Sequence, residues 1–441
     1  MAKRVPEPTK KPRERCILVG VELDNHRQVL TMEASLSELQ LLADTAGLNV
    51  VGELTQKLER PNPKTFIGKG KVAELKNLAE EKLADIILFD DELSPRHQRE
   101  LEEIFGGNVR VLDRTALILD IFAQHARTRE GALQVELAQY EYRLPRLTRA
   151  WSHLARQAGG GGGRAGSVGG VGLRGPGETQ LEVDRREIRR RIDVLKRELE
   201  KVSAHRERYR AQRKKARIPV IALVGYTNAG KSTLLNQLSD AGVYVADKLF
   251  ATLDPTTRKV MLPGKKQVLF TDTVGFIQKL PTTLVAAFRA TLDEIVDADM
   301  LLHVMDISHP NVRQHAEAVH DTLEEIGAEH IPLITVLNKI DLLPEPEKAK
   351  QILQQFGNAA AISAITGDGL PELLEMVSQR LFDTYLDVEL ILPYREGKII
   401  SLIHHEGRII HEEHVDGGIK IKAKVPGRLA AQIRRNTKYL G

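Results

Sequence analysis

Short apolar runs alternate with amphipathic segments along the first part of the chain. Apolar runs typical of buried strands occupy residues 16–21, 49–54, 84–89 and 109–112. Segments with the 3.6-residue spacing of helices occupy residues 35–48, 71–82 and 94–105. This alternation predicts a small parallel sheet covered by helices. We therefore expect an N-terminal α/β domain over residues 16–129, preceded by a disordered arm over residues 1–15.

The next part of the chain has a different spacing, in which apolar positions recur after three and four residues in turn. One seam comprises Leu133, Leu137, Tyr140, Leu144, Leu147, Trp151 and Leu154, and the other comprises Leu181, Arg185, Ile188, Ile192, Leu195, Leu199 and Val202. Helices with matched 3.5-residue seams pack against each other. Residues 130–217 are therefore predicted to form an antiparallel helical hairpin, with Leu154 opposite Leu181 and Leu133 opposite Val202.

Three features distinguish this hairpin from a plain helical pair. Pro145 should kink the first helix near Glu141, because proline removes a backbone donor and clashes with the preceding turn. Residues 159–177 contain eleven glycines in nineteen positions, which is too little side chain to bury a core. Residues 185–217 carry fifteen Lys or Arg against five Asp or Glu, although the whole chain has a net charge of only +4.

We interpret the hairpin as a stiff probe whose basic arm contacts phosphate backbone. A passive glycine linker and an ordinary charged coiled-coil surface are the alternatives. Aromatic residues make up only 4% of the chain, which favours contacts to folded RNA over base stacking on single strands.

The most specific motif is Gly225-Tyr-Thr-Asn-Ala-Gly-Lys-Ser232, which lies between a strand-like apolar run and a helix-like segment. This is the context of a phosphate-binding loop. Glycine lets the backbone approach closely, and amides at the start of a helix point at the phosphates. Lys231 would reach the β and γ oxygens, and the Ser232 hydroxyl would hold Mg²⁺. A glycine turn that merely opens a helix is the alternative.

Three further motifs follow in the order that a GTP-binding domain requires. The Asp272 carboxylate would hold a water on Mg²⁺, and the Gly275 amide would bond the γ-phosphate. Asp341, in Asn338-Lys-Ile-Asp341, would accept two hydrogen bonds from guanine, and adenine lacks that pair of donors. Ser363-Ala364 is a weaker fifth element. Together these motifs predict a G domain that binds GTP over residues 218–384.

The two switches of this predicted domain leave questions open. Residues 250–258 occupy the position of the first switch, and the spacing does not choose among Thr252, Thr256 and Thr257 as the Mg²⁺ ligand. Phe276 stands where many GTPases carry a glutamine that orients the attacking water. A phenyl ring has no acceptor, so hydrolysis needs another group of this chain, a backbone carbonyl or a partner. We expect slow basal turnover that a partner raises.

The last part of the chain returns to short elements. The G domain should add a strand at 298–305 and a closing helix at 370–382, and a small α+β domain over 385–441 should have strands at 388–393, 408–415 and 418–425 with helices at 397–405 and 429–435. His411 and His414 do not predict a metal site, because on a strand they point to opposite faces. A solvated sheet edge is the better interpretation.

Composition limits the class of protein. A length of 441 residues indicates about three domains. No run is apolar enough to span a bilayer, and the N-terminus lacks a secretory signal. The single cysteine, Cys16, excludes an internal disulfide and a cysteine metal cluster, and we expect it to be a small buried side chain. A reducing cytoplasm fits this composition.

The motifs together resemble the HflX GTPases, translation-associated G proteins of the Obg-like group. The matching stretches are Ile121-Phe-Ala-Gln124, Gln134-Val-Glu-Leu-Ala-Gln139, Gly172-Leu-Arg-Gly-Pro-Gly-Glu-Thr-Gln-Leu-Glu182, the phosphate loop, Leu249-Phe-Ala-Thr-Leu-Asp-Pro255 and Asp272-Thr-Val-Gly-Phe276. The segment 172–182 is the most specific, because ordinary G domains lack it. The glycine tract at 159–170 is longer than is usual in the family, which leaves the contacts of the loop open.

The resemblance implies a fold, a site and partners. The fold class would be α/β: a parallel-sheet N-terminal domain, an antiparallel helical hairpin with a Gly-rich tip, a P-loop G domain and a small α+β C-terminal domain. It implies that Thr252 and Ser232 are the protein ligands of Mg²⁺, and that Lys231, Thr252 and Gly275 are the catalytic residues. The implied GTP/GDP site comprises Gly225, Tyr226, Thr227, Asn228, Ala229, Gly230, Lys231, Ser232, Thr233, Phe250, Ala251, Thr252, Leu253, Asp254, Asp272, Thr273, Val274, Gly275, Asn338, Lys339, Ile340, Asp341, Ser363, Ala364 and Ile365.

The resemblance also implies a monomeric cytoplasmic protein that binds the 50S ribosomal subunit, with the hairpin on rRNA near the peptidyl-transferase region. It implies GTPase activity that ribosomes stimulate, and splitting of stalled or idle 70S ribosomes, notably under heat shock. Family members are also reported to use ATP through the N-terminal domain, although no motif here carries that by itself. Two other functions compete: a GTP-gated rRNA-binding factor of 50S assembly, and an ATP-dependent RNA remodeller.

Overall fold

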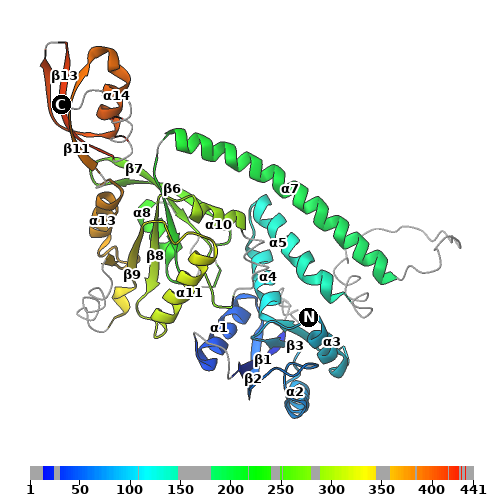
Figure 1. Cartoon of the computed structure of the whole chain (residues 1–441). Coiled ribbons are helices and arrows are strands. Elements are labelled where there is room, and N and C mark those ends of the chain that lie inside the picture. The colour runs from blue at the N-terminus through cyan, green and yellow to red at the C-terminus, as the bar shows by residue number, and fades with distance from the viewer. Residues whose placement is uncertain are drawn as a thin grey trace, which may run out of the picture.

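The computed structural model describes residues 13–23, 30–107, 109–147, 180–216, 218–239, 249–250, 252–279, 289–343, 358–382, 385–415, 417–426, 429 and 433. Most of the predicted arm over residues 1–15, the glycine-rich loop over residues 159–177 and the predicted site residue Ala251 lie outside the described residues. Figure 1 shows the N-terminal and C-terminal domains at opposite ends of the molecule, with the G-domain sheet between them. A long helix, α7 (Gln180–Ala216), runs past the G domain and the N-terminal domain.

The N-terminal domain is the parallel α/β unit that the apolar runs predict. Its strands are β1 (Arg15–Leu23), β2 (Asn49–Leu58), β3 (Ile86–Phe89) and β4 (Arg110–Asp113), and its helices are α1 (Met32–Thr45), α2 (Lys69–Glu81), α3 (Pro95–Ile104) and α4 (Arg114–His125). The strands lie in the order β2-β1-β3-β4, and every pair is parallel. The predicted parallel sheet is therefore confirmed.

Side chains of β1 alternate between two apolar cores, as the two-residue period of a strand requires. Cys16 and Leu18 pack with α1 and α4 on one face, and Ile17 and Val19 pack with α2 and α3 on the other. Cys16 is fully buried, as expected for a small core side chain. Helix α4, which the apolar pattern did not predict, sends side chains into the core that the N-terminal domain shares with the G domain.

Helices α5 (Arg129–Arg143) and α7 form the predicted antiparallel pair. Their buried contacts comprise Leu133, Leu137, Ile192 and Leu195, with Tyr140, Leu144, Ile188, Leu199 and Val202 around them. Arg129, which starts α5, pairs with Glu198 at 3.4 Å. Leu147, beyond the end of α5, accepts a hydrogen bond from Arg185 at 3.4 Å. Opposite ends of the two helices therefore meet. Trp151 and Leu154 of the first seam lie outside the described residues.

Pro145 ends the first helix and does not kink it, so the predicted kink near Glu141 is wrong. Helix α5 stops at Arg143, and a 3-10 turn, η1 (Leu144–Arg146), follows. The Arg146 guanidinium fixes this turn to the N-terminal domain, because it donates to the Leu93 carbonyl at 2.6 Å. Proline has no backbone N–H to donate. At the second residue of this turn no helical hydrogen bond needs that donor, so the chain can change direction there.

The G domain has a six-stranded sheet in the order β10-β9-β8-β5-β7-β6, in which only β6 is antiparallel to its neighbour. Its described strands are β5 (Val220–Val224), β6 (Thr256–Leu262), β7 (Lys266–Asp272), β8 (Met300–Asp306), β9 (Leu333–Asn338) and β10 (Ala359–Ala361), and its described helices are α8 (Lys231–Ser239), α10 (Arg289–Val296), α11 (Val312–Glu325), the 3-10 turn η3 (Ile340–Leu342) and α13 (Leu370–Phe382). Helices α8 and α13 pack on one face, whereas α10 and α11 pack on the other.

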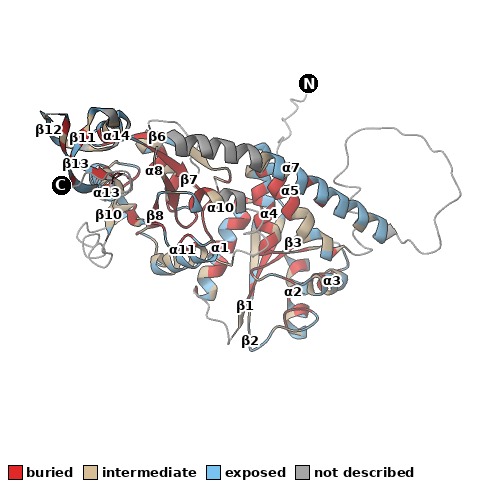
Figure 2. Cartoon of the chain, turned by 45° about the horizontal axis from the view of Figure 1, so that its top comes forward, coloured by how far each residue is buried: buried red, intermediate tan, exposed pale blue. Residues whose placement is uncertain are grey.

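The face that carries α10 and α11 continues into the N-terminal domain. One apolar cluster joins Leu292 and Val319 of the G domain with Leu39 and Phe122 of the N-terminal domain. Figure 2 shows the buried residues gathered in the two sheets and at the root of the hairpin, with exposed residues along the outer part of α7. The two domains are therefore docked through a shared core.

The C-terminal domain is an antiparallel sheet in the order β11-β13-β12 with one helix. Its elements are β11 (Tyr385–Pro393), the 3-10 turn η4 (Tyr394–Glu396), α14 (Gly397–Glu406), β12 (Arg408–Val415) and β13 (Gly418–Pro426). Of the predicted helix at 429–435, the structure describes only Leu429 and Ile433, which are both buried. Within the described residues no three His, Cys, Asp or Glu side chains gather as a metal site, and no helix has the length and apolar character needed to span a membrane.

Candidate nucleotide site

The phosphate loop joins β5 to α8, as its sequence context predicts. Gly225 and Gly230 have positive φ values of 153° and 92°. A Cβ at Gly225 would collide with the Val304 carbonyl of β8, and one at Gly230 would collide with the Asn338 amide of β9. Glycine is therefore required at both positions by backbone conformation and by close approach.

Lys231 lies at the start of α8 and bends back over this loop. Its ammonium donates to the carbonyl oxygens of Gly225 and Tyr226 at 2.9 Å and 2.8 Å. Burial lowers the pKa of Lys231 to about 8, and the Asp272 carboxylate opposes that shift. A buried ammonium is stabilised by an anion, so this end of the loop is electrostatically prepared for a phosphate group.

Three oxygen-bearing side chains converge beside the loop. The Ser232 hydroxyl donates to the Asp272 carboxylate at 2.6 Å and lies 2.8 Å from the Thr252 hydroxyl oxygen. Asp272 is fully buried, and its Oδ1 has no hydrogen-bond partner among the described residues. Burial raises the pKa of the Asp272 carboxyl, and Lys231 opposes that shift. An all-oxygen set with an unpartnered carboxylate oxygen suits Mg²⁺.

Thr252 therefore lies at this cluster, whereas the other two threonines of the first switch lie on β6. Thr257 exchanges a hydrogen bond with Thr271 at 3.0 Å across the β6–β7 ladder. Thr256 is the first residue of β6 and pairs in register with Asp272. The observed contact with the Ser232 hydroxyl thus favours Thr252 among three threonines that the spacing alone left equivalent.

Gly275 and Phe276 pass directly under the phosphate loop. A Cβ at Gly275 would lie 2.8 Å from the Thr227 Cα and 3.0 Å from the Lys231 ammonium. The Phe276 amide donates to the Gly225 carbonyl at 3.0 Å, and the Thr227 amide donates to the Phe276 carbonyl at 2.8 Å. The Phe276 ring is 2% exposed and packs in the apolar cluster. It is therefore fixed in place without presenting an acceptor.

The base end of the site is built from the ends of β9 and β10. Asn338 donates to the Ala229 carbonyl at 2.9 Å and accepts from the Ala364 amide at 2.9 Å, so it ties the phosphate loop to the fifth motif. Lys339 has a left-handed φ of 68° and pairs with Asp306 at 2.7 Å. Asp341 lies exposed on the turn that follows. Ile365 is 70% exposed, so both side chains are available to a planar base.

Five further predicted residues are held by contacts within the protein. Structural contacts hold Thr273, whose hydroxyl donates to the Leu223 carbonyl at 2.6 Å, and Ser363, whose hydroxyl accepts from the Thr366 amide at 3.1 Å. Phe250 and Leu253 are buried in the core shared with the N-terminal domain, and the Asp254 carboxylate accepts hydrogen bonds from the N-terminal end of α5. The motif pattern places these three side chains in the nucleotide-binding segment, but their contacts lie at the interface with the N-terminal domain and the hairpin.

A buried polar network that no sequence motif predicts lies between the phosphate loop and the N-terminal domain. The Tyr226 hydroxyl donates to Glu38 and accepts from the Gln278 amide at 2.9 Å. Arg114, which is 2% exposed, pairs with Glu38 and with Asp90, the latter at 2.7 Å. Burial raises the pKa of Tyr226 to about 12, so the hydroxyl keeps its proton at neutral pH.

The same network reaches the second switch. The Lys279 ammonium lies 2.5 Å from Asp90 and 2.7 Å from Asp91. The Tyr226 ring stacks on the His315 ring of α11, with 3.8 Å between centroids and 2° between planes. Burial lowers the pKa of His315 to about 4, so that ring is neutral at pH 7. No local spacing signals these contacts, because each joins isolated residues from distant parts of the chain.

Comparison with known proteins gives four family matches in succession. The chain matches the family models described as GTP-binding GTPase N-terminal over residues 33–123, GTP-binding GTPase Middle Region over 125–213, 50S ribosome-binding GTPase over 220–339 and HflX C-terminal domain over 348–439.

Individual relatives match over nearly the whole length. The GTPase HflX of Caldanaerobacter subterraneus subsp. tengcongensis is 46% identical over 423 residues, which cover 96% of this chain and 93% of that protein. The GTPase HflX of Escherichia coli strain K12 is 43% identical over 415 residues, which cover 94% of each. The crystal structure of the SsGBP and GDP complex is similar at 25% identity and a TM-score of 0.46, covering 84% of this chain and 99% of that one. With more than 40% identity to these two relatives over more than nine-tenths of its length, the chain belongs to the HflX family of GTPases.

Proposed function

We propose that this GTPase binds the 50S ribosomal subunit and splits stalled or idle 70S ribosomes, in particular under heat shock. The observation that carries the proposal is a stiff two-helix lever, with a basic outer face, whose root is docked on the nucleotide switches. GTP binding and hydrolysis follow from the family. The ribosomal target, the monomeric state and a cytoplasmic location are parts of the proposal.

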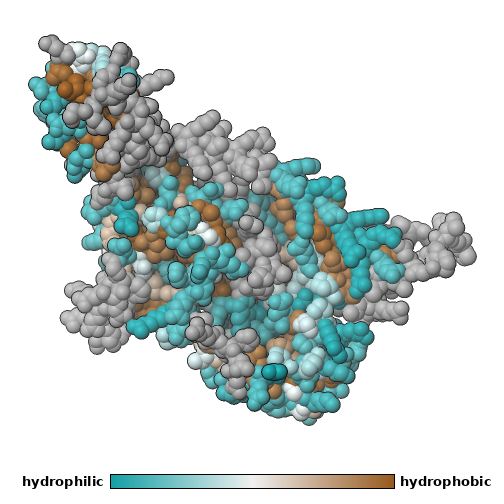
Figure 3. All heavy atoms as spheres, in the orientation of Figure 1, coloured by the Kyte–Doolittle hydropathy of each residue, from teal (hydrophilic) through white to brown (hydrophobic). Residues whose placement is uncertain are grey.

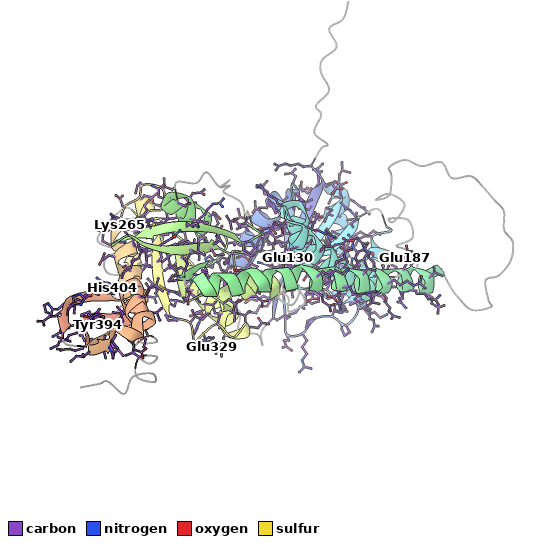
Figure 4. The ribbon with its side chains drawn as sticks, turned by 90° about the horizontal axis from the view of Figure 1, so that it is seen from above. Glu130, Glu187, Lys265, Glu329, Tyr394 and His404 are labelled. Atoms are coloured by element: carbon purple, nitrogen blue, oxygen red, sulfur yellow. The ribbon has the colours of Figure 1, made fainter. Side chains whose placement is uncertain are left out.

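The basic face of α7 supports an RNA partner. Arg191 and Lys196 are already neutralised, because they pair with Glu136 and Glu141 of α5 at 2.7 Å and 2.9 Å. Arg189, Arg190 and Arg197 are exposed. Figure 3 shows hydrophilic residues flanking a narrow apolar strip along the described part of the hairpin, and Figure 4 shows α7 extending as a rod, with Glu187 near its outer end. Exposed guanidinium groups on a rod suit contacts to phosphate backbone.

The chemistry at the nucleotide is positioning and charge stabilisation, as phosphoryl transfer requires. We propose that Lys231 holds the β and γ oxygens and that the Gly275 amide bonds the γ-phosphate. Ser232 and Thr252 would hold Mg²⁺, with Asp272 bonding its water. Mg²⁺, when bound, neutralises charge on the phosphates. Asp341 selects guanine, with Asn338, Lys339 and Ala364 shaping the base pocket.

Slow basal hydrolysis follows from Phe276. Two hydrogen bonds hold the backbone of Phe276, and its buried phenyl ring has no acceptor with which to polarise a water. The attacking water must therefore be oriented by another group of this chain, by a backbone carbonyl or by a partner. We propose that the ribosome raises the rate by supplying or positioning that acceptor.

Sucrose-gradient sedimentation tests the proposal directly. Purified 70S ribosomes are incubated with the full chain and GDP, a non-hydrolysable GTP analogue or an ATP analogue. We expect the chain to migrate with 50S particles and the 70S peak to shrink with the GTP analogue only. Equal binding with GDP and an unchanged 70S peak would refute ribosome splitting. Preference for 50S precursors over mature particles would favour an assembly factor instead.

A further inference from the structure

We propose that Asp254 is a positioning residue that couples the bound nucleotide to the root of the hairpin. In this view the first switch connects two sites: Thr252 at the phosphate end and the N-terminus of α5 at the hairpin end. The proposal requires only that the G domain binds GTP. It does not depend on any action on ribosomes.

The Asp254 carboxylate caps the first helix of the hairpin from outside. It accepts from the backbone amides of Arg127 and Thr128, each at 2.8 Å, and from the Thr128 hydroxyl. The Thr128 hydroxyl oxygen in turn accepts from the Gly131 amide at 3.0 Å, as the N-cap of α5. A carboxylate at the N-terminus of a helix accepts hydrogen bonds from amides that have no partner within the helix, and its charge interacts favourably with the helix dipole. Asp254 and Thr128 therefore act as one two-residue cap.

The start of α5 is shaped to receive this carboxylate. Gly131 lies in the first turn, and a Cβ there would collide with Asp254 Oδ1. The φ angle of Gly131 is not positive, so backbone conformation does not demand glycine at this position. The space taken by the Asp254 carboxylate supplies the reason.

Neighbouring apolar residues attach the same switch segment to the hairpin root. The Phe250 ring meets the Phe122 ring of α4 edge-on, with centroids 4.7 Å apart and planes at 76°. Leu253 is 2% exposed in the shared core. Figure 4 places Glu130, in the first turn of α5, where the hairpin meets the body of the molecule. The switch is therefore held against α4 and α5 by both packing and hydrogen bonds.

Thr252, two residues before Asp254, contacts the other site. The Thr252 hydroxyl oxygen lies 2.8 Å from the hydroxyl oxygen of Ser232, which is in the first turn of α8. Two trans peptide units span at most about 7 Å between their outer Cα atoms. Thr252 cannot move far from Ser232 without pulling on the Asp254 cap. The two contacts are therefore linked by covalent geometry.

This linkage works in both directions, because a coupling free energy between two sites is reciprocal. Thr252 already lies beside Ser232 while Asp254 caps α5, so a change from GTP to GDP that lets Thr252 leave this position shifts or releases the cap and so re-aims the hairpin. Equally, a force on the hairpin changes the relative affinity for GTP and GDP. Couplings of this kind typically amount to about 5-fold to 150-fold in affinity.

The full chain allows a direct test with a pair of spin labels. Cys16 is buried, and burial raises its pKa to about 11, so its thiol resists labelling at neutral pH. Labels at Arg189→Cys on α7 and Glu317→Cys on α11 report the distance from hairpin to G domain, since both positions are exposed. Distances are measured by pulsed electron resonance with GDP and with a non-hydrolysable GTP analogue plus Mg²⁺.

We expect the labelled chain to give different distance distributions with the two nucleotides. Asp254→Ala should make them coincide and should change the ratio of GTP-analogue to GDP affinity by about 5-fold or more. Gly131→Ala should have the same effect from the hairpin side, because its Cβ would displace the Asp254 carboxylate while the sequence of the switch stays unchanged. Asp254→Asn, which keeps an acceptor oxygen, should retain part of the response. Asp120→Asn, an exposed change on α4, is the matched control and should behave as the parent.

The outcomes separate the proposal from a merely structural role. If the parent shows no nucleotide-dependent distance change, or if Asp254→Ala and Gly131→Ala both keep the parental change, the coupling does not run through this cap. A variant that binds both nucleotides and melts like the parent, yet loses the distance change, supports it. The measurement uses no ribosomes, so its failure leaves the ribosomal function untouched, and the reverse also holds.

Discussion

Charge reversal on the outward face of α7 gives a quantitative test of RNA contact. The change is Arg189→Glu, Arg190→Glu and Arg197→Glu, three exposed residues on one helix. Each phosphate contact contributes about 0.7 to 0.9 to the slope of log affinity against log salt. If each arginine neutralises one phosphate, the triple variant should lose about 2 to 3 units of that slope. The ratio of the parent's affinity to the variant's affinity should then fall by about 30-fold between 50 mM and 200 mM salt.

The structure also decides which arginines to change. Arg191 and Lys196 hold the hairpin together through Glu136 and Glu141. Reversing them would place like charges between α5 and α7 and would confuse loss of contact with loss of structure.

The assay is titration of 50S subunits with the full chain and a GTP analogue at several salt concentrations. Lys64→Glu, Lys69→Glu and Lys76→Glu form the matched control, because they make the same charge change at exposed positions of the N-terminal domain. An unchanged slope in the α7 variant, or an equal loss in the control, would refute the contact. Basal GTP hydrolysis without ribosomes should stay at the parental rate in both.

Three further perturbations test the nucleotide site and its supports. Asp341→Asn should lower GTP affinity by about 100-fold or more, because two hydrogen bonds to a charged acceptor are lost, and it should improve binding of xanthosine triphosphate. Arg114→Leu should destabilise the chain by about 3 to 5 kcal/mol, because it leaves Glu38 buried without its cation and leaves Asp90 with Lys279 alone. Leu195→Ala should cost about 2 to 5 kcal/mol at the centre of the hairpin, where that side chain is fully buried. Nucleotide titration checks the first, and denaturant unfolding of the G-domain and hairpin transitions checks the other two.

Each of these has a result that would count against the reasoning. Unchanged preference for guanine in Asp341→Asn would mean that the base lies elsewhere. A melting profile of Arg114→Leu equal to that of the parent would mean that the buried carboxylates find other partners. Loss of stability in Leu195→Ala that spreads equally to the C-terminal domain would point to global misfolding, since that domain has its own separate core.

The sequence determines those features whose cause lies within a few residues. The phosphate loop needs Gly225, Gly230 and Lys231 at fixed spacing, and a strand before it and a helix after it are visible in the apolar pattern. The same holds for the strands of the N-terminal sheet and for the two heptad seams, because periods of 2, 3.5 and 3.6 residues record which face is buried. Ser94-Pro95 likewise starts α3, where the Ser94 hydroxyl accepts from the His97 amide at 3.2 Å.

The sequence was less informative where the same local pattern allowed more than one structure. Proline in a helical pattern permits either a kink or an end, and packing of Arg146 on the N-terminal domain decides for an end. Three threonines of the first switch satisfy the same spacing, and only the tertiary structure brings Thr252 within 2.8 Å of the Ser232 hydroxyl oxygen.

Only the tertiary structure decides how the nucleotide elements meet the rest of the molecule. Tyr226 and Glu38 are 188 residues apart, and Asp254 and Thr128 are 126 apart. Neither pair leaves a periodic signal, because a single polar residue gives no spacing to detect. Their contacts depend on the docking of two separately folded sheets through one apolar core. Local sequence motifs thus determine which nucleotide the G domain binds, whereas the packing of the domains determines which other elements contact the nucleotide-binding segments.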